Sequence, residues 1–121
     1  MQRLSFFLPL LLWLTLPISA AHAQSEKSIW YFGQQAGLSF AEAGPKPLLD
    51  SKMATYEGCA VATNSRGQLL FYTNGETVFN RQHQVMPNGR KLLGSNANAQ
   101  SSQSALVVPD PGSGNIFYVF T

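Results

Sequence analysis

Two stretches of the chain have the same layout and begin 46 residues apart, at Gly58 and at Ser104. The first continues as CAVAT-NSRG-QLLFYT and the second reads SALVV-PDPGSG-NIFYVFT, so each has a small-residue run, a turn and an aromatic run ending in threonine. A repeat of this length built from short strands is typical of a β-propeller blade. We therefore expect an all-β fold of antiparallel meander blades, a β-propeller-like domain that is incomplete in this chain. The alternative is two unrelated hairpins in a sandwich.

The rest of the chain favours the same fold class, because helical periodicity is nearly absent after residue 23. Short runs rich in β-branched and aromatic residues alternate with clusters of Gly, Asn, Pro and Ser, which predict strands and turns. The predicted strands are residues 28–32, 37–40, 59–63, 68–73, 76–80, 104–108 and 116–120, with a short outer strand near Val85. Residues 41–58, which contain two prolines, are predicted to be a linker.

The pair Asn74-Gly75 lies between two predicted strands and indicates their register. Asn-Gly favours a two-residue type I′ turn, since both central residues of that turn need positive φ. Thr73 would then face Glu76, and Phe71 would face Val78. One face of the sheet would carry Leu70, Tyr72, Thr77 and Phe79, and the other Leu69, Phe71 and Val78. Because both faces are apolar, we expect this sheet to pack between two other layers.

The first 23 residues have the organisation of a secretory signal peptide. A short basic start precedes the apolar stretch FFLPLLLWLTL, and the segment ends in Ala21-His22-Ala23. We predict cleavage after Ala23, leaving residues 24–121 as about two blades of one β-propeller-like domain. Two prolines and the short apolar length argue against an uncleaved membrane anchor, so no stable membrane span is expected after cleavage. The protein is expected to be secreted or displayed at the cell surface.

The charge of the predicted mature chain indicates no polyanionic partner. Its seven basic and six acidic residues leave a net charge of +1, and the basic residues are scattered along the sequence. Nucleic-acid binding would require a basic stripe or patch. Nucleic acid is therefore not an expected partner.

No catalytic residue, cofactor or metal site is predicted. Cys59 is flanked by small and apolar residues and is expected to be a buried, unreactive thiol. His83 is the one histidine of the mature chain, whereas a zinc site needs three or four ligands. The serines at 101, 102 and 104 lack the G-x-S-x-G context of a nucleophile elbow, and no aspartate-rich calcium loop is present.

Three side chains are candidates for contacts with a protein partner or a glycan. Trp30 lies in the first predicted strand and is the aromatic residue most expected to be exposed. Asn96 and Gln100 belong to a loop over residues 94–104, whose amides could hydrogen-bond to a sugar or a peptide.

The sequence thus favours a non-enzymatic scaffold whose rigid blades hold binding loops. One alternative is the N-terminal part of a polysaccharide-acting hydrolase or lyase whose catalytic residues lie beyond this chain. Another is a truncated fragment without independent function.

Three segments carry a family likeness: IWYFGQQAGLSF, YEGCAVATNSRGQLLFYTNGETVFNRQHQVMPNG and LLGSNANAQSSQSALVVPDPGSGNIFYVFT. Together they span most of residues 28–121, which resemble the N-terminal region of large exported proteins of Bacteroidetes. Those proteins look like β-propeller ectodomains, often followed by immunoglobulin-like repeats and a gliding-motility-associated sorting domain of type IX secretion. The resemblance implies passage across the outer membrane and an adhesion- or gliding-related role. It carries over no catalytic residues.

Overall fold

The computed structural model describes residues 27–42, 44–56, 58–92 and 103–121, and all of its elements are β-strands. They form three antiparallel sheets, with the orders β1-β2-β3, β4-β5-β6 and β7-β8, here called the first, middle and third sheets. The strands are β1 (Ile29–Phe32), β2 (Ala36–Glu42), β3 (Gly44–Leu48), β4 (Ala60–Thr63), β5 (Leu69–Thr73), β6 (Val78–Asn80), β7 (Leu106–Pro109) and β8 (Phe117–Phe120). The expected all-β, antiparallel class is confirmed.

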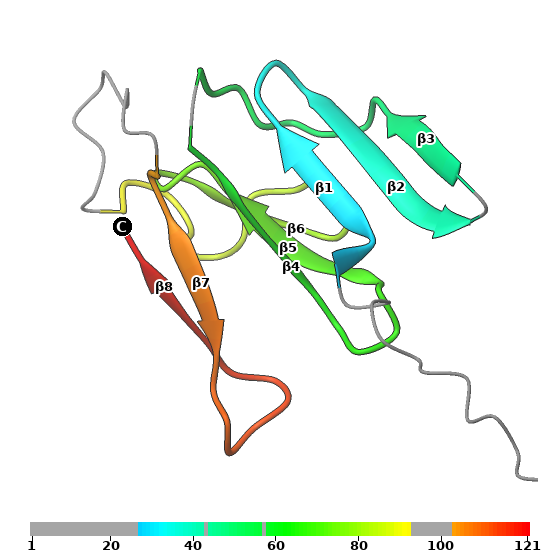
Figure 1. The fold of residues 1–121 in the computed structure, drawn as a ribbon. Helices are drawn as coiled ribbons and strands as arrows, with labels where there is room; N and C mark the ends of the chain where they lie inside the picture. The colour runs from blue at the N-terminus through cyan, green and yellow to red at the C-terminus, as the bar shows by residue number, and fades with distance from the viewer. Residues whose placement is uncertain (1–26, 43, 57, 93–102) are drawn as a thin grey trace, which may run out of the picture.

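Neighbouring sheets contact each other through their first strands. Strand β1 contacts β4, and β4 contacts β7 (Figure 1). Two serine side chains join the sheets: Ser28 Oγ donates to the carbonyl of Gly67 at 3.1 Å, and Ser104 Oγ donates to that of Gly58 at 2.9 Å. The two residues that begin the 46-residue repeat are thus in direct contact.

The middle sheet is covered on both faces, as its sequence predicts. On one face Tyr72 packs with Tyr31 of the first sheet, their ring centroids 4.8 Å apart, and with the fully buried Met53. On the other face Phe71 meets Phe117 of the third sheet edge to face, with centroids 5.4 Å apart. The half-buried residues around the first cluster are Ile29, Leu48, Cys59, Val61, Leu69 and Phe79.

The prediction that residues 41–58 form a linker is wrong, because this segment contains β3. Proline is tolerated in an edge strand, where a missing N–H breaks no ladder. Strand β3 is such an edge, since it pairs with β2 alone and places Pro47 opposite Leu38.

The same segment also supplies the centre of the core. Ser51, Met53 and Thr55 are buried while the residues between them are exposed, as in an extended chain with two faces. The Gln35 N–H donates to the Met53 carbonyl at 3.0 Å, which ties the segment to the β1–β2 turn. The buried side chains of residues 51–55 therefore fill the space between the first and middle sheets.

The predicted type I′ turn at Asn74-Gly75 is also wrong. Thr73 pairs with Val78 and Tyr72 with Phe79, so the loop has four residues and the register differs by two. Asn74 Oδ1 accepts the N–H groups of residues 76 and 77 at 3.1 and 2.9 Å, which closes a wider, side-chain-capped turn. Gly75 alone has positive φ there, at +88°, and a Cβ on it would overlap the Ser104 carbonyl.

A register shift of two residues leaves each side chain on the same face of the sheet, because side chains alternate between the two faces. Phe71, Tyr72 and Phe79 therefore keep their predicted faces. Leu69 and Leu70, which precede these aromatic residues in β5, lie on the faces opposite to those predicted. Thr63 pairs with Leu69 and Ala62 with Phe71, so Leu70 is an extra residue in a β-bulge. Leu69 consequently packs against the core, while Leu70 lines a cleft on the opposite face.

Other turn predictions are confirmed. The Gly67 N–H donates to the Asn64 carbonyl at 2.9 Å, and Gly67 has φ +74°, as expected for the end of that turn. Val85 forms an isolated bridge with Phe79, in the place predicted for a short outer strand. Two consecutive positive φ values, which a type I′ turn needs, occur instead at Gln34 and Gln35.

Candidate functional site

The outer face of the first sheet carries an exposed aromatic surface centred on Trp30. Its members, here called the Trp30 face, are Trp30, Phe32, Leu38, Phe40 and Pro47. Trp30 is 53% exposed, as its sequence position predicts, and its ring centroid lies 5.1 Å from that of Phe40. Its Nε1–H donates to the Lys27 carbonyl at 2.9 Å, which fixes the orientation of the indole. An oriented, exposed indole is suited to stack on a sugar ring or to anchor a protein partner.

Strand alternation explains why this surface forms. Ile29 and Tyr31 point toward the core, so Trp30 and Phe32 must point the other way. Pairing then aligns Trp30 with Leu38 and Leu38 with Pro47 across the three strands. The Trp30 face is therefore a continuous apolar row and not an isolated exposed ring.

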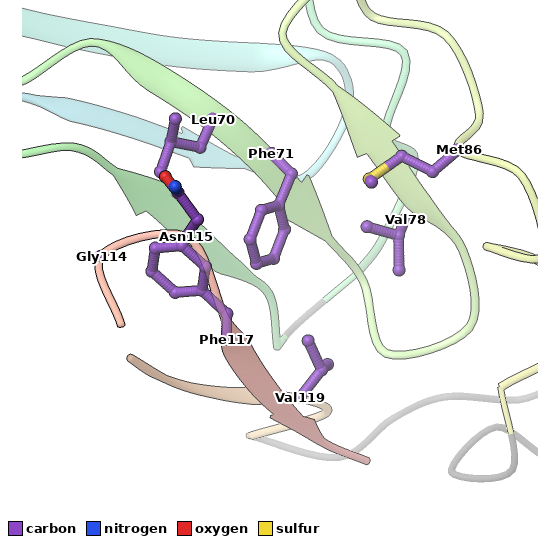
Figure 2. A pocket seen from close by; sticks show the side chains of 8 residues that line it. All are labelled: Leu70, Phe71, Val78, Met86, Gly114, Asn115, Phe117 and Val119. Atoms are coloured by element: carbon purple, nitrogen blue, oxygen red, sulfur yellow. The ribbon is translucent and has the colours of Figure 1, made fainter. Parts of the chain in front are cut away.

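An open cleft lies between the middle and third sheets (Figure 2). Its volume is about 410 Å³, and Phe71 and Phe117 project into it from the two sheets. The remaining lining residues are Leu70, Val78, Met86, Gly114, Asn115 and Val119. This cleft is suited to apolar groups. The sequence does not predict this cleft, because its lining residues come together only when the middle and third sheets pack.

The outer face of the third sheet is apolar as well. Leu106 pairs with Phe120 and Val108 with Tyr118, which places all four side chains on one face. Each is more than a third exposed, with Phe120 the most exposed at 59%. Both end sheets thus present apolar residues to solvent, whereas the middle sheet is covered.

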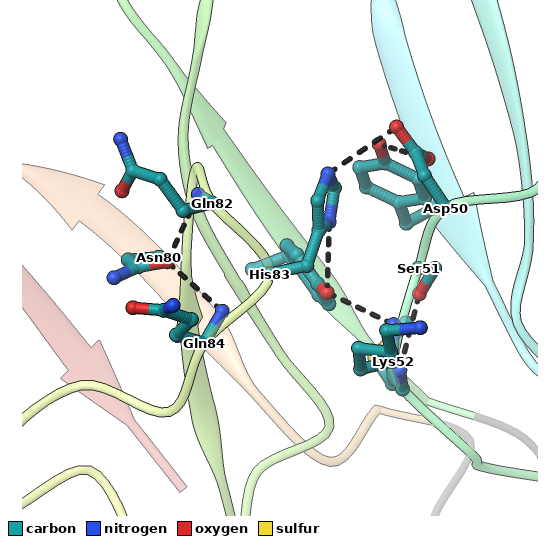
Figure 3. Close-up of polar contacts among 10 residues, drawn as sticks. Asp50, Ser51, Lys52, Asn80, Gln82, His83 and Gln84 are labelled. Carbon is teal, nitrogen blue, oxygen red and sulfur yellow. Dashed lines mark hydrogen bonds and ion pairs between the residues drawn. The ribbon is translucent and has the colours of Figure 1, made fainter.

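A polar network lies where the first sheet, the middle sheet and the 81–84 turn meet (Figure 3). Tyr31 donates to Asp50 Oδ1 at 2.8 Å, and His83 Nε2 lies 3.2 Å from Asp50 Oδ2. His83 Nδ1 is 3.2 Å from the Tyr72 hydroxyl, which also accepts the Lys52 N–H at 3.0 Å. The turn itself is held by Asn80, whose Oδ1 accepts the N–H groups of residues 82 and 84.

The order Asp–His–Tyr suggests a catalytic relay, but the geometry makes it structural. The carboxylate favours a proton on Nε2 of His83, which leaves Nδ1 to accept the Tyr72 proton. Tyr72 is fully buried, so its oxygen cannot meet a substrate. Burial, the hydrogen bond to Asp50 and the Asp50 charge also raise the pKa of Tyr31. The network joins the two sheets through the Tyr31 and Tyr72 hydroxyls.

Two further residues with reactive side chains, Cys59 and Ser104, make structural hydrogen bonds. Cys59 is half-buried and its Sγ donates to the Tyr31 carbonyl at 3.1 Å, while burial raises the pKa of the thiol. Ser104 is buried, and its Oγ donates to the Gly58 carbonyl, two residues before β4. Within the described part of the chain, no three His, Cys, Asp or Glu side chains gather as a metal site would require.

Several predicted features lie outside the described residues: the cleavage site at Ala23, the serines at 101 and 102, and the contact candidates Asn96 and Gln100. The ranges that are described contain no helix with the length and apolarity to cross a membrane. Comparison of the chain with protein families, characterised proteins and solved structures finds no match.

Proposed function

We propose that this protein is an exported, non-enzymatic interaction scaffold of the cell surface, with a β-propeller-like architecture. The proposed ligand is a surface polysaccharide or protein bound on the Trp30 face and by the loop that contains Asn96 and Gln100. The observation that carries the proposal is the exposed, hydrogen-bonded indole of Trp30 within a continuous apolar row.

The propeller-like architecture is supported by the way in which the sheets succeed one another. The first and middle sheets are three-stranded antiparallel meanders, and the third is a two-stranded antiparallel hairpin among the described residues. The first strands contact in the order β1, β4, β7. Neighbouring blades of a propeller pack face to face with their first strands innermost. The Gly58–Ser104 contact favours a true structural repeat over two unrelated hairpins.

The binding proposal is tested with the protein recovered after expression of the full chain. Glycan arrays and affinity electrophoresis would compare wild type with Trp30→Ala and with Asn96→Ala/Gln100→Ala. Loss of a contact aromatic ring costs about 2 kcal/mol, so Trp30→Ala should weaken binding by at least about tenfold. Phe120→Ala, on the far face of the third sheet, is the matched control and should bind normally. Equal binding by Trp30→Ala and wild type would refute the proposal.

Export is tested separately. Mass spectrometry of the product recovered outside the cytoplasm should give an N-terminus at Gln24. An N-terminus at Met1 in a membrane fraction would refute cleavage and favour an anchor.

A hydrolase or lyase would be recognised in the same binding experiment. A scaffold leaves a bound polysaccharide at its original chain length. New reducing ends or unsaturated products would replace the scaffold proposal with an enzymatic one.

A further inference from the structure

The dipeptide Asn-Gly occurs twice in the chain, at Asn74-Gly75 and at Asn88-Gly89. Asparagine before glycine is chemically labile, because glycine has no side chain to hinder attack of its main-chain nitrogen on the preceding amide. The glycine nitrogen gives its proton to water or hydroxide and bonds to Cγ of the asparagine, and ammonia leaves. Water then opens the resulting succinimide to aspartate or isoaspartate. Because water is the only co-reactant, the rate at each site depends on how the fold holds the two residues.

At Asn74 the fold restrains both reacting groups. The Gly75 N–H, which must lose its proton, donates to Oγ1 of the buried Thr73 at 3.0 Å. The Asn74 amide, which must turn toward that nitrogen, accepts the N–H groups of residues 76 and 77 at 3.1 and 2.9 Å. It also donates to the Ala54 carbonyl at 3.4 Å. Attack at Asn74 therefore requires four hydrogen bonds to break.

Asn88 lies in a less restrained turn. The Gly89 N–H donates to the Met86 carbonyl at 2.9 Å, which closes a β-turn over residues 86–89. Pro87 is the second residue of this turn and Asn88 the third, with φ +59°, which is the residue pattern of a type II turn. The Asn88 side chain is exposed and has no hydrogen bond within the described part of the chain. Among the described residues, one hydrogen bond, that of the turn, therefore opposes attack at Asn88.

The two sites also differ in what the product would disturb. Isoaspartate lengthens the main chain by a methylene group. At residue 74 it would displace Gly75 from Ser104, a contact so close that a Cβ on Gly75 would overlap the Ser104 carbonyl. At residue 88 it would act beside β6, where the Val78 N–H donates to the Gly89 carbonyl at 2.8 Å. The restrained asparagine is thus the one that lies against the segment leading into β7.

We propose that Asn88 is a site of spontaneous deamidation in the folded protein and that the fold protects Asn74 from the same reaction. Asn74 is held by three more hydrogen bonds than Asn88. At the usual net contribution of each bond, this difference should slow the reaction at Asn74 by about a hundredfold. The modification is independent of binding at the Trp30 face and goes beyond the function proposed above.

The test follows the protein from the full chain during incubation at mildly alkaline pH, in buffer and in urea. Peptide mapping by mass spectrometry measures aspartate and isoaspartate at residues 74 and 88 over time. In buffer, Asn88 should convert about a hundredfold faster than Asn74. In urea, where both turns are lost, the two rates should become similar. The Val78 amide of the deamidated, folded protein should exchange its hydrogen faster than that of fresh protein.

Thr73→Val tests the cause of the protection. This substitution keeps the shape of the side chain and removes the acceptor of the Gly75 N–H. It should accelerate conversion of Asn74 in buffer by about fivefold and leave the rate at Asn88 unchanged.

Three results would overturn the proposal. Equal rates at the two sites in buffer would show that the fold does not protect Asn74. An Asn88 that stays unmodified in buffer while it converts in urea would show that its turn is protective as well. A hundredfold difference that persists in urea would assign the order to local sequence and not to the fold. These comparisons use the wild-type chain, so they hold even if Thr73→Val does not fold.

Discussion

The hydroxyl of Tyr72 joins three segments, so its removal gives the sharpest test of how the first and middle sheets are held together. The oxygen accepts the Lys52 N–H at 3.0 Å and lies 3.2 Å from His83 Nδ1, on a side chain that is fully buried. Tyr72→Phe keeps the ring and its packing on Tyr31 but removes both hydrogen bonds. The substitution therefore changes the hydrogen bonding of this side chain and leaves its apolar packing in place.

The magnitude follows from the number of partners left unpaired. Each lost hydrogen bond costs about 1 kcal/mol net, and a desolvated partner without water raises this to about 1–3 kcal/mol. For two partners at the edge of the core, we expect a loss of about 2–3 kcal/mol in the free energy of unfolding. Urea denaturation followed by far-ultraviolet circular dichroism measures this directly, with the slope unchanged.

The matched control is Tyr118→Phe. Its hydroxyl makes a 3.4 Å contact with Asp110 Oδ2 on an exposed strand, so the free energy of unfolding should change by less than about 0.5 kcal/mol. If Tyr72→Phe fell within the same range as this control, the network would not be a structural link between the sheets.

Three further predictions concern a turn, an interface and alkaline pH. Gly75→Ala should destabilise the protein by about 1–3 kcal/mol in urea, because its φ is +88° and a Cβ would overlap the Ser104 carbonyl, two residues before β7; Gly114→Ala, with open space around it, should be close to neutral. A double-mutant cycle with Phe71→Leu and Phe117→Leu should give a coupling energy of about 0.5–1.5 kcal/mol, and additive effects would contradict the edge-to-face contact. The folded state raises the pKa of Tyr31 and so favours its neutral form; stability from this group is complete below the ordinary tyrosine pKa of about 10 and falls as the pH rises above it. Alkaline urea titrations of Tyr31→Phe should therefore show a smaller loss than wild type, and an equal loss would contradict this assignment.

Much of the strand pattern is readable from local sequence, because β-branched and aromatic runs between turn residues are local signals. Residues 59–63 and 68–73 predict β4 and β5 to within one residue. The two apolar faces of β5 also predict correctly that Phe71 and Tyr72 pack against different layers.

The errors arise where long-range contacts decide the local structure. Asn74-Gly75 has the residues of a type I′ turn, but Gly75 is needed for its close approach to Ser104, which lies just before β7. Pro45 and Pro47 usually indicate a loop, yet β3 tolerates them because it is an edge strand. Met53 lies in a segment without strand character, and its burial depends on the two sheets that enclose it.

The candidate sites also differ in whether local sequence or long-range contacts determine them. Exposure of Trp30 follows from the alternation of one strand and could be predicted. The Asp50–His83–Tyr72 network joins residues from three segments, and the cleft that Phe71 and Phe117 enter requires two sheets, so neither has a local signal in the sequence.

The indole N–H of Trp30 offers the most direct measurement of the central claim, that this face binds the ligand. Its signal in a proton–nitrogen correlation spectrum is well separated from the amides and is assigned with Trp30→Phe. Titration with a polysaccharide fragment or partner found in the binding screen should shift this signal progressively, while the amides of Met53 and Tyr72 stay in place. Saturable binding that leaves the Trp30 indole signal unmoved would contradict the account.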